Sequence, residues 1–402
     1  MKKSLFALAA LGAFATAAQA QSTVTLYGTF DSSIGYATGL PTRQNAVDID
    51  NLQTTTQTTG TSLNFIDGSF ATSAWGMRGS EDLGGGMKAN FHLESDILTN
   101  TGQTHSDGLF RRAANVSISD PKLGEVFLGR RGNAFIIATG TMLPVQGNTV
   151  HQWRSVINSS GGDQYSNSVS YATPTIMATD VLVQYALNNS VDAGDDGTVF
   201  AANMFNRSIP NLTISAAYNN VKGANNAQNL SAPNTFTSSS TNPYKNVAST
   251  NLEGYAAGLK YKVSPALEVG TFYAHGRQNN GSAVTAATRY VSSGATGVGV
   301  GYQATPAILL GANYIKTTFA AQMINLQAHY MLSKRTRVYT QLTFNQGATG
   351  NNQSGDLSAF SFTPIHCNSS TTTVCADGIR SSGASTSKAS NNGYVAGIIH
   401  SF

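Results

Sequence analysis

The last ten residues carry the strongest indication of the fold, and they read Gly393-Tyr-Val-Ala-Gly-Ile-Ile-His-Ser-Phe402. Large apolar side chains interchange here with small or polar ones, which predicts an amphipathic β-strand. The strand ends on an aromatic residue. A terminal aromatic strand is weak evidence alone, so it has to be considered together with the opposite end of the chain.

The beginning of the chain has the layout of a secretory signal peptide. Lys2 and Lys3 stand before an apolar run that ends in the small residues of Ala18-Gln19-Ala20. A basic start, an apolar centre and a small-x-small cleavage site predict a signal peptide over residues 1–20. The mature domain would then span 21–402. An exported chain that closes on an amphipathic, aromatic-ended strand is typical of an outer-membrane β-barrel.

The composition agrees with a barrel in a membrane. Charged residues make up 11% of the sequence, against roughly 25% in soluble domains. The formal net charge is +4, and it becomes +2 without Lys2 and Lys3, which argues against nucleic acid as a partner. Mean hydropathy is −0.14. Beyond the signal peptide no segment has the roughly 18 consecutive apolar residues of a membrane helix, whereas a barrel averages lipid-facing and lumen-facing side chains.

Several segments alternate with a period of two residues. In residues 324–332 (INLQAHYML), apolar side chains occupy one face and Asn325, Gln327 and His329 the other. Residues 337–344 (RVYTQLTF) behave similarly. This alternation predicts β-strands with one apolar face, but a soluble sandwich would give the same pattern.

The connections between these segments distinguish the two folds, because short and long connections alternate along the chain. This asymmetry is typical of a membrane barrel, with tight periplasmic turns and long external loops. The link near 316–320 is a short exception. Short turns are predicted at 82–85, 120–124, 173–174, 209–211, 264–265, 305–306 and 333–334. Long polar links are predicted near 36–62, 95–109, 131–163, 188–197, 221–250, 276–294 and 346–391.

The sequence therefore predicts an all-β fold, a transmembrane antiparallel β-barrel of about sixteen strands. An open sheet edge in lipid would leave unpaired backbone groups at several kcal/mol each, so the barrel has to close. We expect the first strand, 23–31, to pair with the last, 394–402. Alternation places Tyr27 and Asp31 on the lumen face of that first strand.

Two cysteines, Cys367 and Cys375, lie close together in a stretch rich in Ser, Thr and Asn. In an exported chain this spacing predicts a disulfide within the last external loop. A metal site there has little support, because only His366 stands nearby.

Catalytic and cofactor motifs are absent from the sequence. Residues 297–301 (GVGVG) lack the G-x-G-x-x-G spacing of a dinucleotide loop, and their alternation fits a strand. The seven histidines include no H-E-x-x-H pair, and no G-x-S-x-G nucleophile elbow occurs. A catalytic site assembled from distant residues stays open, because serine is abundant. We expect no catalytic residue, no metal and no cofactor.

The chain resembles a known family, the trimeric general-diffusion porins of Gram-negative outer membranes. The resemblance is to the beta-proteobacterial type. The strand rhythm extends the resemblance over the whole mature chain. The motifs that carry it are 24–31 (VTLYGTFD), 75–94 (WGMRGSEDLGGGMKANFHLE), 109–112 (LFRR), 124–130 (GEVFLGR) and 397–402 (GIIHSF).

The resemblance implies a homotrimer in which loop 3, here about 131–162, folds into each lumen. Residues 142–147 (MLPVQG) resemble the loop-tip motif Pro-Glu-Phe-Gly of the family, with Val145 at the acidic position and Gln146 after it. No Asp or Glu occurs between Glu125 and Asp163. Pores of the family commonly set acidic loop residues against basic wall residues, which creates an electric field across the lumen. The acidic side of that field is therefore missing from this loop.

The basic wall residues of the family are retained. Alternation places Arg78 on the strand face opposite Trp75, and it places Lys88 on the equivalent face of the next strand. We expect this face to line the lumen, because each charge would cost ~2–4 kcal/mol at mid-depth on the lipid face. Arg112 matches the family's lumen arginine, and Arg130 follows at the start of loop 3. We expect Arg78, Lys88, Arg112 and Arg130 to line the pore, with Val145 and Gln146 at its constriction. Three further arginines lie nearby on faces that the sequence does not define: Arg111, Arg131 and Arg154.

These observations predict a water-filled channel in the Gram-negative cell outer membrane for passive diffusion of small hydrophilic solutes and inorganic ions. Wall arginines concentrate anions, so we expect an anion preference. Outer-membrane lipid and lipopolysaccharide would surround the barrel. Two rival hypotheses stay open: an outer-membrane barrel enzyme of the lipase or protease type, and a surface adhesin that uses its long loops.

Overall fold

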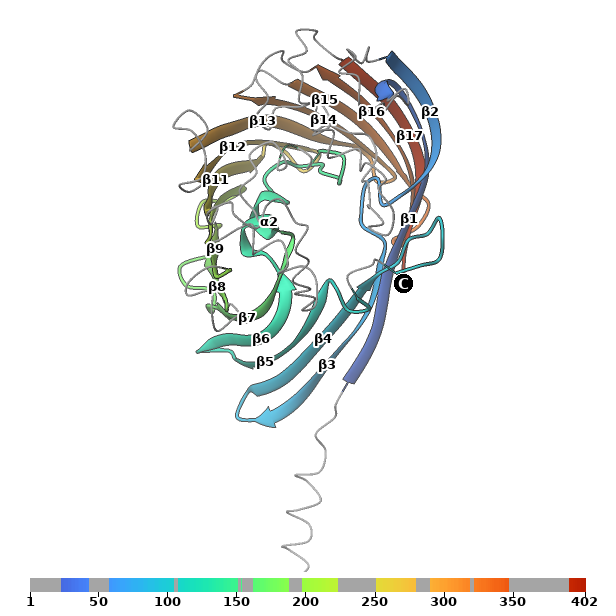
Figure 1. The fold of residues 1–402 in the computed structure, drawn as a ribbon. Coiled ribbons are helices and arrows are strands. Elements are labelled where there is room, and N and C mark those ends of the chain that lie inside the picture. Colours follow the sequence, from blue (N-terminus) through green and yellow to red (C-terminus); the bar gives the residue numbers. More distant parts are fainter. Residues whose placement is uncertain are drawn as a thin grey trace, which may run out of the picture.

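The computed structural model describes residues 23–42, 58–104, 108–150, 153, 162–187, 197–222, 251–279, 290–318, 322–346 and 390–402. Strands of these residues form a single sheet that closes into a barrel, and Figure 1 shows the ring. The predicted signal peptide and the two cysteines, Cys367 and Cys375, lie outside the described residues.

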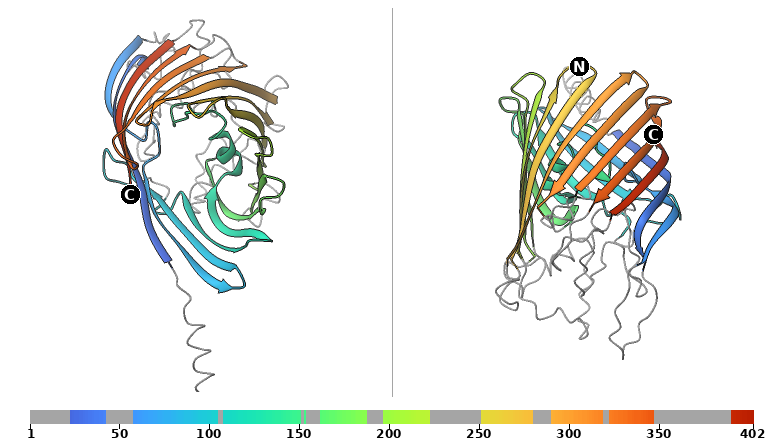
Figure 2. Two further views of the ribbon diagram at one scale, coloured as in Figure 1. Left: turned by 180° about the vertical axis from the view of Figure 1, so that it is seen from behind. Right: turned by 90° about the horizontal axis from the view of Figure 1, so that it is seen from above.

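All neighbouring strands of the sheet are antiparallel. Their tilt relative to the barrel axis is visible in the right-hand view of Figure 2. In chain order the strands are β1 (Thr23–Thr42), β2 (Thr58–Asp67), β3 (Ala74–Gly84), β4 (Met87–Asp96), β5 (Ala113–Asp120), β6 (Gly124–Gly132), β7 (Gln164–Ala172), β8 (Thr179–Ala186), β9 (Val199–Asn206), β10 (Leu212–Val221), β11 (Asn251–Lys262), β12 (Leu267–Asn279), β13 (Tyr290–Thr305), β14 (Ile308–Thr317), β15 (Gln322–Met331), β16 (Thr336–Gln346) and β17 (Ser390–Ser401).

The segments β2 and β3 together form one interrupted strand. On one edge, β1 pairs with β17, residues 29–38 against 392–401. On the other edge, residues 32–42 of β1 pair with β2 and residues 23–29 pair with β3. Residues 68–73 are inserted between β2 and β3, so the two segments occupy a single position in the ring. The described strands therefore make a sixteen-stranded barrel, which confirms the prediction of about sixteen strands. The first and last strands pair as predicted, but through residues 29–38 of β1 rather than 23–31, because residues 23–29 pair with β3.

The strand faces explain why this sequence forms a barrel. Outward side chains are large and apolar and remain exposed, as Ile324 and Leu326 do, whereas the inward Asn325, Gln327 and His329 are buried. This distribution is the reverse of a soluble core, and it suits a wall with lipid outside and a polar interior. The alternation predicted for residues 324–332 and 337–344 is the one observed.

The short turns also lie where the sequence places them. Between β3 and β4 the chain turns through Gly84 and Gly85, with φ of +83° and +65°, values that favour glycine. The Asp82 carboxylate accepts a hydrogen bond of 2.8 Å from Gly84 N and stabilises this turn.

One helix, α2 (Ala134–Thr139), was not predicted from the sequence and lies inside the ring of strands (Figure 1). Asn133 caps it by accepting from Phe135 N at 2.9 Å. A helix this short is marginal alone, so its stability comes from buried contacts of Phe135 and Ala138. Among the described residues, no helix is both long enough and apolar enough to cross a membrane.

Candidate functional site

The segment after α2 lies against the inward face of the barrel wall. A Cβ atom at Gly270 would stand 2.7 Å from Met142 O, and one at Gly311 would stand 2.8 Å from Val145 Cβ. Such approaches are possible only because these wall positions carry no side chain. The inward glycines that contact residues 142–145 in this way are Gly258, Gly270, Gly299, Gly301 and Gly311.

An apolar cluster joins the same segment to the wall. Trp153 stacks on Phe272 of β12, with ring centroids 4.4 Å apart and an interplanar angle of 27°. Met142 and Leu143 belong to the same buried cluster. The described part of the connection between β6 and β7 is therefore held on β9–β15 by a packed apolar cluster inside the ring.

The far end of this segment is bound to the insertion between β2 and β3. Asn148 Nδ2 donates to Gly68 O at 2.7 Å, and Asn148 N donates to Phe70 O at 2.9 Å. Thr149 Oγ1 donates to Ser69 O at 3.0 Å. Residues 68–73 thus hold one end of the segment, and α2 holds the other end.

Asp31 on β1 holds the insertion itself. Its Oδ2 atom accepts hydrogen bonds from Phe70 N at 2.7 Å and Ala71 N at 2.8 Å, and its Oδ1 atom accepts from Tyr339 Oη at 2.6 Å. Asp31 is fully buried on the inward side. This carboxylate links β1, the insertion and β16.

Charged side chains gather on another part of the inward wall, along β3–β6. Arg112, which directly precedes β5, lies 2.5 Å from Glu94 and 3.2 Å from Asp96. Arg111 also forms an ion pair with Asp96. Arg112, which the sequence predicts at the pore, is therefore held in a network with two carboxylates that were not predicted from the sequence.

Arg78 and Lys88 are exposed, and the registers of β3 and β4 place them on the strand face that also carries Tyr27 and His92. The Arg78 guanidinium lies 5.2 Å from the ring centroid of Tyr27. The Tyr27 hydroxyl donates to Glu94 Oε2 at 2.6 Å and also contacts His92. The structure therefore brings Arg78 and Arg112 into one cluster through Tyr27 and Glu94, while Lys88 lies nearer the β3–β4 turn.

Arg130 and Arg131 differ in placement. Arg130 pairs with Ala114, and its side chain donates to Arg111 O and, at 2.6 Å, to Ser166 Oγ. Arg131, whose face the sequence did not define, lies over the ring of Phe127 at 3.9 Å from the centroid. A register shift after Gly129 separates the two arginines, and alternation alone does not reveal such a shift.

Val145 and Gln146 were predicted at the constriction. The Val145 side chain is 4% exposed and is turned to the wall, against Gly301 and Gly311, and its carbonyl accepts from Asn313 Nδ2 at 2.9 Å. Gln146 is partly buried. The acidic position of the family motif therefore holds a wall-facing anchor in this chain.

Val145→Glu is expected to weaken the attachment of residues 142–145 to the barrel wall, in addition to adding a negative charge. A carboxylate enclosed by Gly301 and Gly311 would lack a partner, and its burial would cost several kcal/mol. We expect faster proteolysis near residues 140–149 in the folded protein. Val145→Ala, which leaves a small gap and no charge, serves as control; equal proteolysis of the two variants would contradict the placement.

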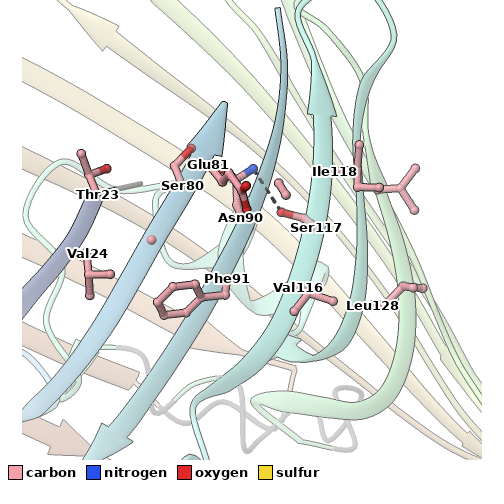
Figure 3. Close-up of a pocket in the computed structure, with 13 residues that line it drawn as sticks. Thr23, Val24, Ser80, Glu81, Asn90, Phe91, Val116, Ser117, Ile118 and Leu128 are labelled. Carbon is pink, nitrogen blue, oxygen red and sulfur yellow. Dashed lines mark hydrogen bonds between the residues drawn. The ribbon is translucent and has the colours of Figure 1, made fainter. Parts of the chain in front are cut away.

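A hollow of about 500 Å³ lies at the wall of β1 and β3–β6 (Figure 3), and most of its apolar lining faces outward. Val24, Phe91, Val116 and Leu128 line it. Because these side chains face away from the lumen, the hollow lies outside the candidate site. In the part of the chain that the structure describes, no group of three or more His, Cys, Asp or Glu side chains is arranged to hold a metal ion.

Comparison with known proteins agrees with this architecture. A family described as Gram-negative porin matches residues 7–350. An outer membrane porin protein of Bordetella pertussis is 34% identical over 206 residues, 48% of this chain and 49% of that protein. Outer membrane porin protein 32 of Delftia acidovorans is 43% identical over 130 residues, 32% of each chain. The matched segments thus span half or less of these relatives.

Among solved structures, the anion-selective porin from Comamonas acidovorans has the same fold. Its TM-score is 0.67 at 19% identity, and the match covers 95% of this chain and 100% of that chain.

Proposed function

Because the chain belongs to the Gram-negative porin family, we propose that it forms a water-filled channel through the outer membrane for passive diffusion of small hydrophilic solutes and ions. The observation that carries the proposal is the division of the inward wall. One part is covered by the packed segment after α2, and the part along β3–β6 carries arginines. Loop 3, residues 131–162, would narrow the passage.

The charges along β3–β6 support an anion preference. Arg78, Arg111, Arg112, Arg130 and Arg131 lie along this wall. The two carboxylates in their network are Glu94 and Asp96. A third carboxylate of this wall, Glu125, is hydrogen-bonded to Asn90 and Ser117. The five arginines still outnumber these three carboxylates, and loop 3 supplies no acid of its own. Fixed positive charge raises the local concentration of anions and repels cations.

The zero-current potential across a KCl gradient tests this function. We expect the purified protein to conduct in planar bilayers and to favour chloride. Arg112→Gln should lower the chloride-to-potassium permeability ratio about fivefold, as expected for a change of ~1 kcal/mol, because Glu94 and Asp96 lose their partner. The shift should shrink at 1 M salt, where the Debye length is ~3 Å.

Arg207→Gln is the matched control, since Arg207 lies in the turn after β9 and pairs with Asp180. It should leave the ratio unchanged. A wild-type channel that strongly prefers potassium would overturn the anion preference. A protein that never conducts would overturn the channel itself.

The channel carries out no bond chemistry in this proposal. Hydrolysis of lipid or peptide by the purified protein would support the enzyme hypothesis instead. Binding to host surfaces without conductance would support the adhesin. We further propose removal of residues 1–20, a homotrimer in outer-membrane lipid and lipopolysaccharide, and the Cys367–Cys375 disulfide.

A further inference from the structure

Three arginines on the inward wall are each stacked on an aromatic ring. Two of the rings, those of Tyr27 and Phe127, belong to wall strands, and the third, that of Phe70, belongs to the insertion between β2 and β3. The stacked pairs, with distances from guanidinium carbon to ring centroid, are Arg78 on Tyr27 (5.2 Å), Arg131 on Phe127 (3.9 Å) and Arg337 on Phe70 (4.5 Å).

These arginines differ from the other arginines of the wall in their partners. In the part of the chain that the structure describes, no carboxylate forms an ion pair with Arg78, Arg131 or Arg337, whereas Arg111 and Arg112 both pair with Asp96. A carboxylate partner occupies the N–H edge of a guanidinium. An aromatic partner occupies a face and leaves the edge available.

Two stacked arginines lie at the two ends of the segment on the wall. Arg131 stands just before α2, where the connection between β6 and β7 begins. Phe70, under Arg337, lies against Gly147 near the other end, where a Cβ would stand 2.6 Å from the Phe70 ring. Arg131 and Arg337 therefore place guanidinium groups near both ends of this segment, and the Nη1 atom of Arg131 is buried there without a hydrogen-bond partner among the described residues.

We propose that Arg78, Arg131 and Arg337 make the channel prefer planar oxyanions, such as nitrate and carboxylates, over halides. The ring holds each guanidinium plane in a fixed orientation. Two parallel N–H groups of a fixed edge match two oxygens of a planar anion, a geometry that a spherical halide does not use. This inference rests on the proposed anion-conducting channel and adds a chemical preference among anions.

Replacement by lysine separates charge from geometry. Lysine keeps the positive charge but has neither the planar fork nor the stacking surface. In the triple variant Arg78→Lys, Arg131→Lys, Arg337→Lys, we expect the nitrate-to-chloride and acetate-to-chloride permeability ratios to fall about two- to threefold. The anion-to-cation ratio should stay near that of the wild type. Bi-ionic zero-current potentials of the potassium salts measure all three ratios.

Arg207→Lys is the matched control, because Arg207 also stacks on an aromatic ring, that of Phe205 at 5.5 Å, but lies in a turn and pairs with Asp180. It should change none of the ratios. Phe127→Leu tests the platform directly, since it leaves the Arg131 charge in place. We expect it to lower the oxyanion-to-chloride ratios in the direction of the lysine variants.

A conducting triple-lysine channel with wild-type oxyanion-to-chloride ratios would overturn this inference and leave the channel proposal intact. Wild-type ratios in Phe127→Leu would remove Arg131 from the preference. Loss of anion over cation preference in the triple variant would also contradict it, because the charge is retained. Absence of conductance in the wild type would overturn the proposed function instead.

Discussion

Asp31→Ala is expected to destabilise the barrel by about 3–5 kcal/mol and to release the segment on its inward wall. The substitution removes the acceptor of three hydrogen bonds, from Phe70 N, Ala71 N and Tyr339 Oη. The insertion 68–73 would then lose its attachment to β1. Unfolding in denaturant with the protein in detergent micelles gives the stability, and limited proteolysis near 140–149 reports release.

Two variants make this expectation specific. Asp82→Ala removes an aspartate of an exposed turn and should cost less than about 1 kcal/mol. Asp31→Asn retains an oxygen for the two backbone N–H groups and an NH₂ group for the Tyr339 hydroxyl, so its loss should be intermediate. If Asp31→Ala behaves like Asp82→Ala in both assays, Asp31 does not hold the insertion.

Gly270→Ala is the second substitution with a large expected effect. Its Cβ would stand 2.7 Å from Met142 O and 3.2 Å from Leu143 Cα, which are backbone atoms and cannot rotate away. The segment has to move from the wall toward the lumen axis. We expect a loss of about 1–3 kcal/mol from this overpacking and a lower single-channel conductance.

Gly132→Ala serves as its control. A Cβ at Gly132 would meet Ile137 at 3.6 Å, an ordinary contact, so stability and conductance should be close to those of the wild type. Equal conductance of Gly270→Ala and Gly132→Ala would show that residues 142–145 do not limit the passage.

The sequence predicted the features that repeat along the chain. Alternation separated Asn325 from Ile324 correctly, because each strand of a closed barrel has to satisfy the same two environments. The short turns followed from glycine and proline. Closure between the chain ends followed from the cost of an open edge in lipid.

Features that depend on contacts between distant segments were not predictable in this way. The interruption between β2 and β3 begins at the turn-favouring pair Asp67-Gly68, where Gly68 has a φ of +68°, but its place on the wall depends on Asp31 and Asn148 from elsewhere in the chain. Helix α2 is too short to show a helical period. The sequence placed Arg112 near the pore but did not reveal that Glu94 and Asp96 pair with it.

The position of Asp31 has a consequence for the order in which the molecule assembles. Its hydrogen bond to Tyr339 Oη joins residues 308 positions apart and reaches from β1 past β17 to β16, across the seam where β1 pairs with β17. Contacts so distant in sequence carry a large loop-closure entropy and form late. The attachment of the insertion is therefore complete only after the C-terminal strands have been added. A nascent barrel would keep a wide interior until closure, and the narrow passage would be the last part of the protein to mature.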